Sequence, residues 1–571
     1  MIRQGIYVVK ELRCIDEGNY DLTTIAMPVL INFDAMKFPD AMHAYQSKQD
    51  DDIPTATGAH DRFWDYVANN PEAIHMVTWI MSDRGVLRSY RHMESWSINT
   101  YTFINDQGKA TYVRFVWKPV LGVESLLQEE AIKIGGIDPD FHRKDLRNAI
   151  EKGAYPEYEL GVQLIPVGDE DKYEIDVLDP TKFWPEEKIP VEIIGKMTLN
   201  RNIENYHTES EQVAFNPANV VPGIDFSNDP VLQGRLIAYH SAQLYRIGPN
   251  FQELPINKPV CPFHNNQRRG PMRTRIDVVH VNYHNNSLAD NTPHETPIEE
   301  GGYEHFPKEV GGHTTRAHVD SVNDFYSQTR IFWNSLTPIE KMHTIEAFSY
   351  QLGNVVDESV RQQNVNLLAN VDVELASTVA DNIGVARPTG SHVPVSESYA
   401  SLSQYHTPPS AYTKKVGVLI GDGFTDQEVL EVLEFFDQQK VFYDIISERL
   451  GYVTGANGTK IKVGKTFLTS GPYLVDSVYV VGGNSSNQKR FTQNVLEFMN
   501  MAYKLYKPIG IALTGQAMIQ GPGMENLEGV VIAGNSDNFK LDFVAAIAQS
   551  RFWNRDDGTG PASLGMTGIT K

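Results

Sequence analysis

The sequence predicts two kinds of structure in one chain, an α+β region built on antiparallel strands and a C-terminal α/β domain. Between about residues 70 and 260, short β-branched and aromatic runs such as 98–103 and 112–117 are separated by turn signals. This pattern is typical of antiparallel strands, which we expect to form a β-barrel. From residue 414, apolar runs followed by glycine turns and amphipathic helices indicate a parallel, flavodoxin-like sheet.

Changes of pattern along the chain divide it into five segments. A polar stretch containing Gly and His follows the barrel and is expected to wrap over a partner subunit. A helical region comes next, in which Thr337, Pro338 and Glu340 predict a capping box. The expected segments are the barrel region 1–260, the wrapping segment 261–318, the helical region 319–384, the Pro- and Ser-rich interdomain linker 385–413 and the α/β domain 414–571.

Composition excludes several classes of protein. The 50 Lys and Arg residues against 72 Asp and Glu give a net charge of −22, which disfavours nucleic acid and anionic membranes as partners. No apolar run approaches the roughly 18 residues of a membrane span. Neither a signal-peptide core at the start nor a peroxisomal tail at 568–571 is present in the sequence, so we expect a cytoplasmic protein.

The segment with the most chemical information is a predicted helix that follows Asp229. Arg235, Tyr239, Gln243 and Arg246 stand at i, i+4, i+8 and i+11 and therefore share one face. A guanidinium next to a phenol favours the phenolate, and a phenolate oxygen is a good axial ligand for ferric iron. Taken alone the motif is weak, because Arg and Tyr at this spacing are mostly surface neighbours.

Further motifs occur in family order along nearly the whole chain, and with them the sequence resembles large-subunit catalases. The resemblance implies the catalase fold with a haem, of type b or a modified form, whose iron has Tyr239 as its proximal tyrosinate ligand. It also implies catalytic support from Arg235, cofactor contacts from Arg246 and Pro222, a homotetramer, and hydrogen peroxide as the substrate of the family. The motifs are Asp83–Gly85, Ser89–Glu94, Trp117–Gly122, Asp138–Arg143, Leu160–Leu164, Leu178–Lys182, Leu199–Asn202, Val221–Asp225 and Pro262–Arg268.

The sequence departs from the family on the opposite, distal side of the expected haem. Family members carry a distal His in an N-terminal section, whereas no His precedes His43 here. Ile25 and Ala26 stand where the family has two Asn residues, and Leu30-Ile31 replaces an aromatic pair. Cleavage of the peroxide O–O bond needs a base and a polar group that orients the oxygens. Apolar side chains supply neither.

Four interpretations therefore remain open. The first is a haem oxidoreductase redirected to another oxidant or to a small organic substrate. The second is a catalase whose N-terminal section lies outside this sequence. The third is a non-catalytic subunit that assembles with a complete catalase. The fourth is a scaffold without haem, against which the retained Arg235, Tyr239 and Arg246 argue.

Two other candidate sites are weaker. His280, His284 and His294 lie in a polar wrapping loop and not on a helix with a carboxylate third ligand, so a metal site there is disfavoured. The C-terminal domain resembles class I amidotransferase-like folds, whose active members place a Cys on the turn that reads Ala-Leu-Thr-Gly-Gln at 512–516 here. No cysteine follows Cys261, which excludes thiol catalysis, and we expect a structural or oligomer-stabilising domain.

Overall fold

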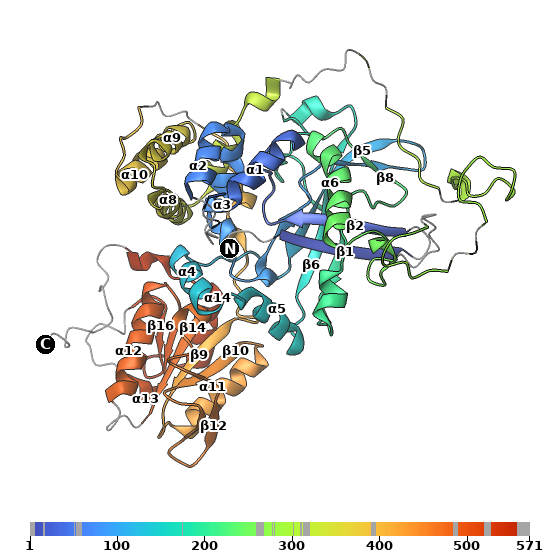
Figure 1. Ribbon diagram of the computed structural model, residues 1–571. Coiled ribbons are helices and arrows are strands. Elements are labelled where there is room, and N and C mark those ends of the chain that lie inside the picture. Colours follow the sequence, from blue (N-terminus) through green and yellow to red (C-terminus); the bar gives the residue numbers. More distant parts are fainter. Residues whose placement is uncertain are drawn as a thin grey trace. The chain divides into compact units, whose positions relative to one another are not determined.

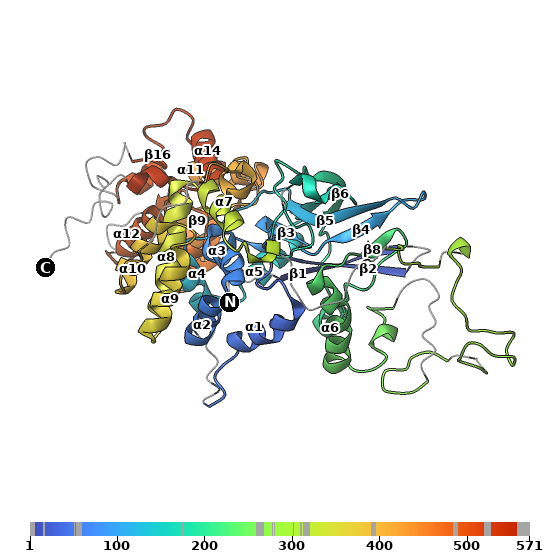
Figure 2. The same cartoon turned by 90° about the horizontal axis from the view of Figure 1, so that it is seen from above.

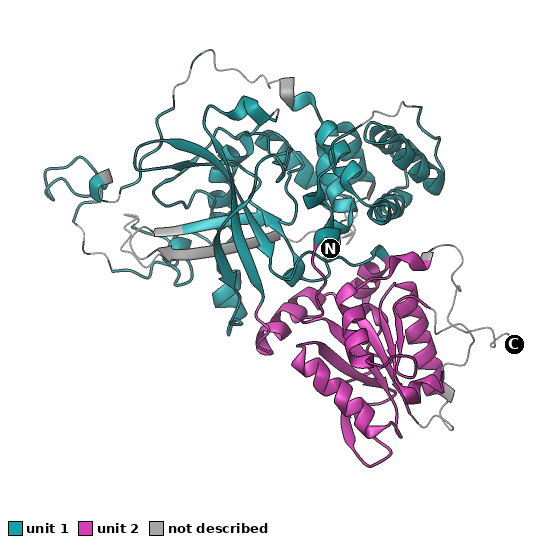
Figure 3. Ribbon diagram, turned by 180° about the vertical axis from the view of Figure 1, so that it is seen from behind, with its two compact units in different colours: residues 1–128, 156–406 teal, residues 129–155, 407–571 magenta. Residues whose placement is uncertain are grey.

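The described residues form two compact units (Figure 1, Figure 3). Unit 1 contains Met1–Gln128 and Pro156–His406, and unit 2 contains Glu129–Tyr155 and Thr407–Lys571. Unit 2 therefore includes a segment from the middle of the chain. The computed structural model describes residues 6–14, 18–50, 52, 60–173, 175–258, 268–276, 278, 280–300, 302–308, 311, 320–389, 395–483, 489–518 and 527–556.

Unit 1 is built on an eight-stranded sheet in which every pairing is antiparallel, as the sequence predicts. The strand order is β1-β2-β3-β5-β4-β8, with β6 pairing with β5 and β7 pairing with β6. No pairing joins β8 to β1 among the described strands, so we describe a curled sheet. The strands are β1 (Ile6–Cys14), β2 (Gly18–Ile25), β3 (Ser95–Trp96), β4 (Tyr101–Ile104), β5 (Ala110–Pro119), β6 (Glu157–Pro166), β7 (Glu192–Thr198) and β8 (Ile224–Phe226).

Helices from both ends of unit 1 share a second apolar core. The N-terminal helix α3 contacts α7 and α8 from the helical region, and these helices lie side by side in Figure 2. The predicted capping box is confirmed, because Thr337 Oγ1 accepts from the Glu340 amide at 3.3 Å and Glu340 Oε2 accepts from the Thr337 amide at 2.8 Å. The helices are α1 (Phe38–Tyr45), α2 (His60–Asn69), α3 (Ile74–Met81), α7 (Ser327–Ser335), α8 (Pro338–Gly353), α9 (Glu358–Leu368) and α10 (Val373–Ile383).

Part of the predicted wrapping segment is bound to strand β8. The buried carboxylate of Asp225 accepts hydrogen bonds from Tyr303 Oη at 2.9 Å, His305 Nδ1 at 2.9 Å and the Phe306 amide at 2.7 Å. One carboxylate thereby fixes three of the four positions from Tyr303 to Phe306 in an otherwise irregular segment. The wrapping residues 261–267 and 312–319, which include Cys261, lie outside the described residues.

Part of the predicted linker is also fixed on unit 1. Glu187 accepts from the Ser401 amide at 3.0 Å and from its hydroxyl at 3.1 Å. Glu340 accepts from the Ser403 hydroxyl at 2.9 Å and from the Gln404 amide at 3.1 Å. Residues 401–404 are thus held by specific hydrogen bonds although their composition is typical of a flexible connection.

Unit 2 contains a parallel six-stranded sheet in the order β13-β10-β9-β14-β15-β16, which confirms the parallel sheet predicted from the apolar runs. Separate apolar clusters cover its two faces, as expected for strands buried on both sides. The strands are β9 (Lys415–Ile420), β10 (Phe442–Ser447), β13 (Lys465–Thr466), β14 (Ser477–Gly482), β15 (Ile509–Ile511) and β16 (Val530–Ile532), and β11 (Gly451–Thr454) pairs with β12 (Lys460–Val463). The helices are α4 (Gln128–Ile137), α5 (Phe141–Glu151), α11 (Asp426–Gln438), α12 (Lys489–Lys504), α13 (Leu513–Gln516) and α14 (Phe539–Gln549).

No helix in the described part of the chain is long and apolar enough to cross a membrane.

Candidate functional site

The candidate site is built on helix α6 (Pro230–Arg246), whose start is fixed by a buried carboxylate. Asp229 accepts from the amides of Val231 and Leu232 at 2.9 and 3.0 Å, and Pro230 suits the first turn. Burial raises the pKa of the Asp229 carboxyl, against the effect of a hydrogen bond from Asn99. The helix that carries the predicted ligand therefore begins at a defined position.

Arg235 and Tyr239 are in contact, as their spacing predicts. Arg235 Nη2 donates to Tyr239 Oη at 3.0 Å, and its guanidinium carbon lies 5.0 Å from the centroid of the phenol ring. The same guanidinium donates to Asn99 Oδ1 and to Thr23 Oγ1 on β2. Burial lowers the pKa of Arg235, but Tyr239 and Tyr101 together outweigh this and hold it above its ordinary value. The phenol oxygen of Tyr239 thus faces a permanent cation.

Asn99 connects the start of α6 to this pair. Its Nδ2 donates to Asp229 Oδ2 at 2.7 Å while its Oδ1 accepts from Arg235, so a chain of hydrogen bonds runs from Asp229 to Tyr239. The preceding Ile98 adopts φ 63°, a strained conformation for a β-branched residue and one that is enriched at functional sites. Sequence analysis missed Asn99 and Thr23, because neither lies in a motif near α6.

Arg246 and Pro222 lie outside this hydrogen-bonded set. Arg246 donates to the backbone carbonyls of Glu211 and Val213, both at 2.5 Å, and to Gln243 Oε1 at 2.7 Å. Pro222 lies exposed in the turn before β8. Cofactor contact by these two residues stays a prediction from the resemblance.

A glycine allows α6 to lie close to the segment around Ala35. A Cβ atom on Gly234 would stand 2.4 Å from the Cβ of Ala35, which is too short for any real contact. We expect Gly234→Ala to lower the free energy of unfolding by about 1–3 kcal/mol, because α6 must shift. The matched control is Gly136→Ala in helix α4, where the added methyl meets open space and should stabilise by up to about 1 kcal/mol. Denaturant titration measures both, and equal stability of the two variants would contradict the close packing.

Of the two predicted distal positions, Ile25 is half-buried and Ala26 is buried. Ile25 ends β2 and pairs with Trp96, and Ala26 packs with Leu87 and Met93. Ala26 thus belongs to an apolar cluster, in agreement with the apolar character predicted from its sequence position.

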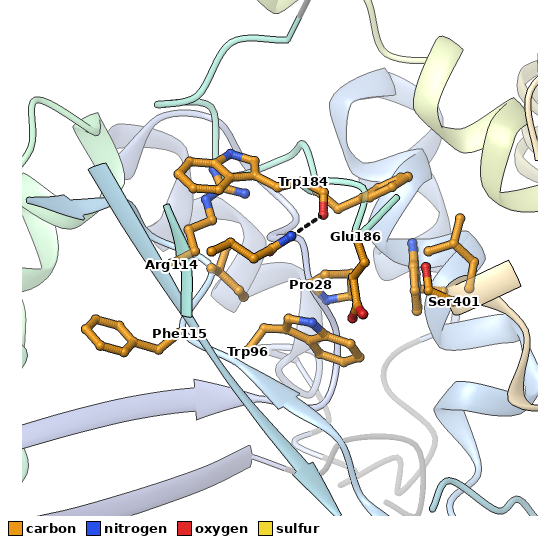
Figure 4. A pocket seen from close by; sticks show the side chains of 12 residues that line it. Pro28, Trp96, Arg114, Phe115, Trp184, Glu186 and Ser401 are labelled. Atoms are coloured by element: carbon orange, nitrogen blue, oxygen red, sulfur yellow. Dashed lines mark hydrogen bonds between the residues drawn. The ribbon is translucent and has the colours of Figure 1, made fainter. Parts of the chain in front are cut away.

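A small cavity of about 30 Å³ lies beside this segment in unit 1 (Figure 4). Its wall includes Pro28 and Ile98, which are close in sequence to Ala26 and Asn99. Five of the twelve lining residues are aromatic, and the hydrogen bond drawn in Figure 4 runs from Gln163 Nε2 to the Trp184 carbonyl at 3.0 Å. The residues are Pro28, Trp79, Trp96, Ile98, Arg114, Phe115, Gln163, Phe183, Trp184, Glu186, Ser401 and Leu402.

The charged groups of the cavity wall are already paired. Arg114 lies 4.7 Å from the Trp184 ring centroid and donates to the carbonyls of Lys182 and Asp179 at 2.5 and 3.0 Å. Burial raises the pKa of Glu186, partly offset by Lys118, whose Nζ lies 2.6 Å from Glu186 Oε2. Sequence analysis did not identify this cavity, because its lining comes from segments far apart in the chain.

The donor set around Tyr239 fits a haem iron. The phenol oxygen accepts a hydrogen bond from a guanidinium, and a tyrosine oxygen is one of the axial ligands that proteins use for haem iron. No group of three or more His, Cys, Asp or Glu side chains suited to a metal ion occurs among the residues that the structure describes. The rings of His284 and His294 lie 6.3 Å apart between centroids.

Comparison with known proteins gives three family matches and a set of long relatives. Residues 13–290 match the catalase family, residues 319–383 the catalase-related immune-responsive family, and residues 412–556 the C-terminal domain found in long catalases. "Catalase" of Alkalihalophilus pseudofirmus is 49% identical over 95% of this chain and 80% of its own length. "Catalase-2" of Bacillus subtilis is 49% identical over 95% and 79%, and "Catalase HPII" of Pseudomonas aeruginosa is 40% identical over 95% and 78%. The chain therefore belongs to the catalase family, in its large-subunit branch with the additional C-terminal domain.

Proposed function

We propose that this protein decomposes hydrogen peroxide at a haem whose iron is bound by Tyr239. The observation that carries the proposal is the 3.0 Å contact between Arg235 and Tyr239 on a helix of a catalase-family chain. Relatives named catalase at 49% identity favour this function over the redirected chemistry expected first from the distal substitutions. Proteins of this family generally bind haem, and the type of haem, b or modified, stays a prediction.

The chain's own residues position the proximal side. A bound haem supplies the ferric iron for peroxide chemistry. Tyr239 presents its oxygen along the face of α6, and Arg235 balances the negative charge of the phenolate. Asn99 and Thr23 hold the guanidinium, while Asp229 fixes both Asn99 and the start of the helix. Arg246 and Pro222 are proposed as additional haem contacts.

A second candidate function is oxidation of a small organic substrate at the same haem. The observation in its favour is the apolar setting of Ala26, which packs with Leu87 and Met93. Apolar side chains such as these can contact apolar groups, but they neither orient peroxide nor accept its proton.

Oxygen evolution from hydrogen peroxide by the parent chain separates the two candidates, and a variant tests the contribution of one amide. With haem bound to the full chain, Ala26→Asn is expected to raise oxygen evolution from hydrogen peroxide by up to about 100-fold, because it adds a polar group that orients the oxygens. Exposed Ala456→Asn is the control and should not change the rate. Oxygen evolution by the parent chain supports the catalase function. Its absence, together with turnover of an organic compound that shifts the Soret band, supports the second candidate.

Catalase-family proteins are typically homo-oligomers, and we propose a tetramer for this chain. Ile237 and Tyr245 on α6 leave 74% and 96% of their surface exposed, which suits burial against another copy. We also propose a flavodoxin-like fold for the C-terminal domain, since β9 lies between β10 and β14 in a wholly parallel sheet. Sedimentation analysis of the purified chain tests the oligomeric state.

A further inference from the structure

The insertion, residues 129–155, interrupts the barrel region but belongs to unit 2. It forms the connection between β5 and β6, which pair over nine positions from Thr111↔Pro166 to Pro119↔Tyr158. The chain therefore crosses between the units at 128/129, 155/156 and 406/407. Within unit 2 the insertion supplies helices α4 and α5 (Figure 3).

A buried ion cluster joins the insertion to the rest of unit 2. Glu130 on α4 is 0% exposed, and its two carboxylate oxygens contact Lys507 Nζ and Arg551 Nη2, the latter at 2.5 Å. Lys507 also donates to the carbonyls of Pro472 and Val475, both at 2.7 Å. Burial lowers the pKa of Lys507 to about 8, against the attraction of Glu130. Arg551 Nη1 donates to the Leu505 carbonyl, so both cations also contact the backbone of the C-terminal domain.

The ion pairs within the insertion itself differ from the Glu130 cluster in their exposure. Three of its cations pair with its own carboxylates: Lys144 with Asp138 at 2.6 Å, Arg147 with Glu151 at 2.9 Å and Arg143 with Asp140 at 3.9 Å. These pairs are largely exposed and contribute little. A fully buried carboxylate, by contrast, is strongly destabilising once its partner is removed.

A second contact lies at the other end of the insertion. Lys152, just after α5, places its Nζ 4.3 Å from the centroid of the Phe442 ring at the start of β10. The insertion is thus bound to the parallel sheet near both of its ends.

We propose that the C-terminal domain acts as a clamp on the connection between barrel strands β5 and β6, with Glu130 as the residue through which it holds the insertion. In this role the domain stabilises a connection within the catalase region. This role requires no cysteine, and the domain carries none for amidotransferase chemistry. The proposal is independent of haem binding and of the proposed reaction.

The test compares two carboxylates of the insertion in the full chain. In Glu130→Gln, amide exchange of α4 and of residues 505–511 should accelerate together by roughly 100-fold, because two buried cations lose their partner. Asp140→Asn removes the same charge from an exposed position, where the ion pair with Arg143 lies within the insertion, and should exchange like the parent. Parent-like exchange in Glu130→Gln would overturn the proposal, as would acceleration confined to α4.

A milder variant keeps the test decisive if Glu130→Gln does not fold. Arg551 lies nearer the surface than Lys507, with 13% of its side chain exposed, and Arg551→Met leaves Glu130 paired with Lys507. We expect about tenfold faster exchange in the same two segments. Unchanged exchange in both segments would show that the ion cluster does not hold the insertion.

Discussion

Tyr239→Phe is expected to abolish the ferric haem spectrum of the reconstituted chain and all peroxide decomposition. Phenylalanine keeps the ring and its packing on α6 but removes the only oxygen that the side chain offers to iron. It also removes the acceptor of the 3.0 Å hydrogen bond from Arg235, which leaves that cation without its phenolate. Ultraviolet-visible spectroscopy after haem addition measures the loss of the ligand-to-iron band, and oxygen evolution measures the loss of activity.

The matched control is Tyr245→Phe on the same helix. Tyr245 is 96% exposed, so its hydroxyl group is not expected to contribute to haem binding. The control should retain the parent spectrum and rate. A parent-like spectrum in Tyr239→Phe would refute the proximal assignment, and loss of haem from both variants would point to a general effect on α6.

Acid is expected to unfold unit 1 through His75. The ring is fully buried, its Nδ1 donates to the Thr181 carbonyl at 2.7 Å, and its Nε2 accepts from Trp79 at 3.3 Å. These two contacts require the neutral ring, and burial lowers the pKa of His75 to about 3. Because the unfolded ring has a pKa of about 6.5, its contribution to stability is present above pH 6.5 and falls by about 1.4 kcal/mol per pH unit down to pH 3, roughly 5 kcal/mol in all.

His75→Gln isolates this effect, because an amide can still donate to Thr181 and accept from Trp79 without titrating. The free energy of unfolding, measured by urea titration between pH 7 and pH 4, should change less steeply with pH in the variant than in the parent. The difference in slope should correspond to the uptake of one proton on unfolding. Exposed His43→Gln should follow the parent curve. Parallel curves for His75→Gln and the parent would exclude His75 as the source of acid sensitivity.

Local patterns in the sequence were sufficient to predict the contact between Arg235 and Tyr239, the antiparallel and parallel character of the two sheets and the capping box. Arg235 and Tyr239 meet because a helix places i and i+4 side chains together, which is a property of the helix itself. The capping box at Thr337 and Glu340 is equally local, and both were correctly predicted. Parallel strands in unit 2 followed from apolar runs long enough to be buried on both faces.

The remaining parts of the site depend on contacts between distant segments. Thr23 reaches Arg235 across 212 positions and Asn99 across 136, and neither carries a distinctive local pattern. The cavity wall and the place of residues 129–155 in unit 2 also depend on contacts between segments that are far apart in the sequence. Neither can be predicted from a local pattern. Periodicity describes which face of an element is buried but not which distant segment covers it.

The ion cluster at Glu130 also sets an order of events during synthesis. Arg551 follows Glu130 by 421 positions, so at about 5–20 residues per second the carboxylate leaves the ribosome roughly 20–80 s before this cation exists. Strands β5 and β6 can pair during that time. The Glu130 side chain on helix α4 cannot yet be buried against Arg551, because that residue has not been synthesised. The last stretch of the nascent chain therefore completes a structure that was begun near its first quarter.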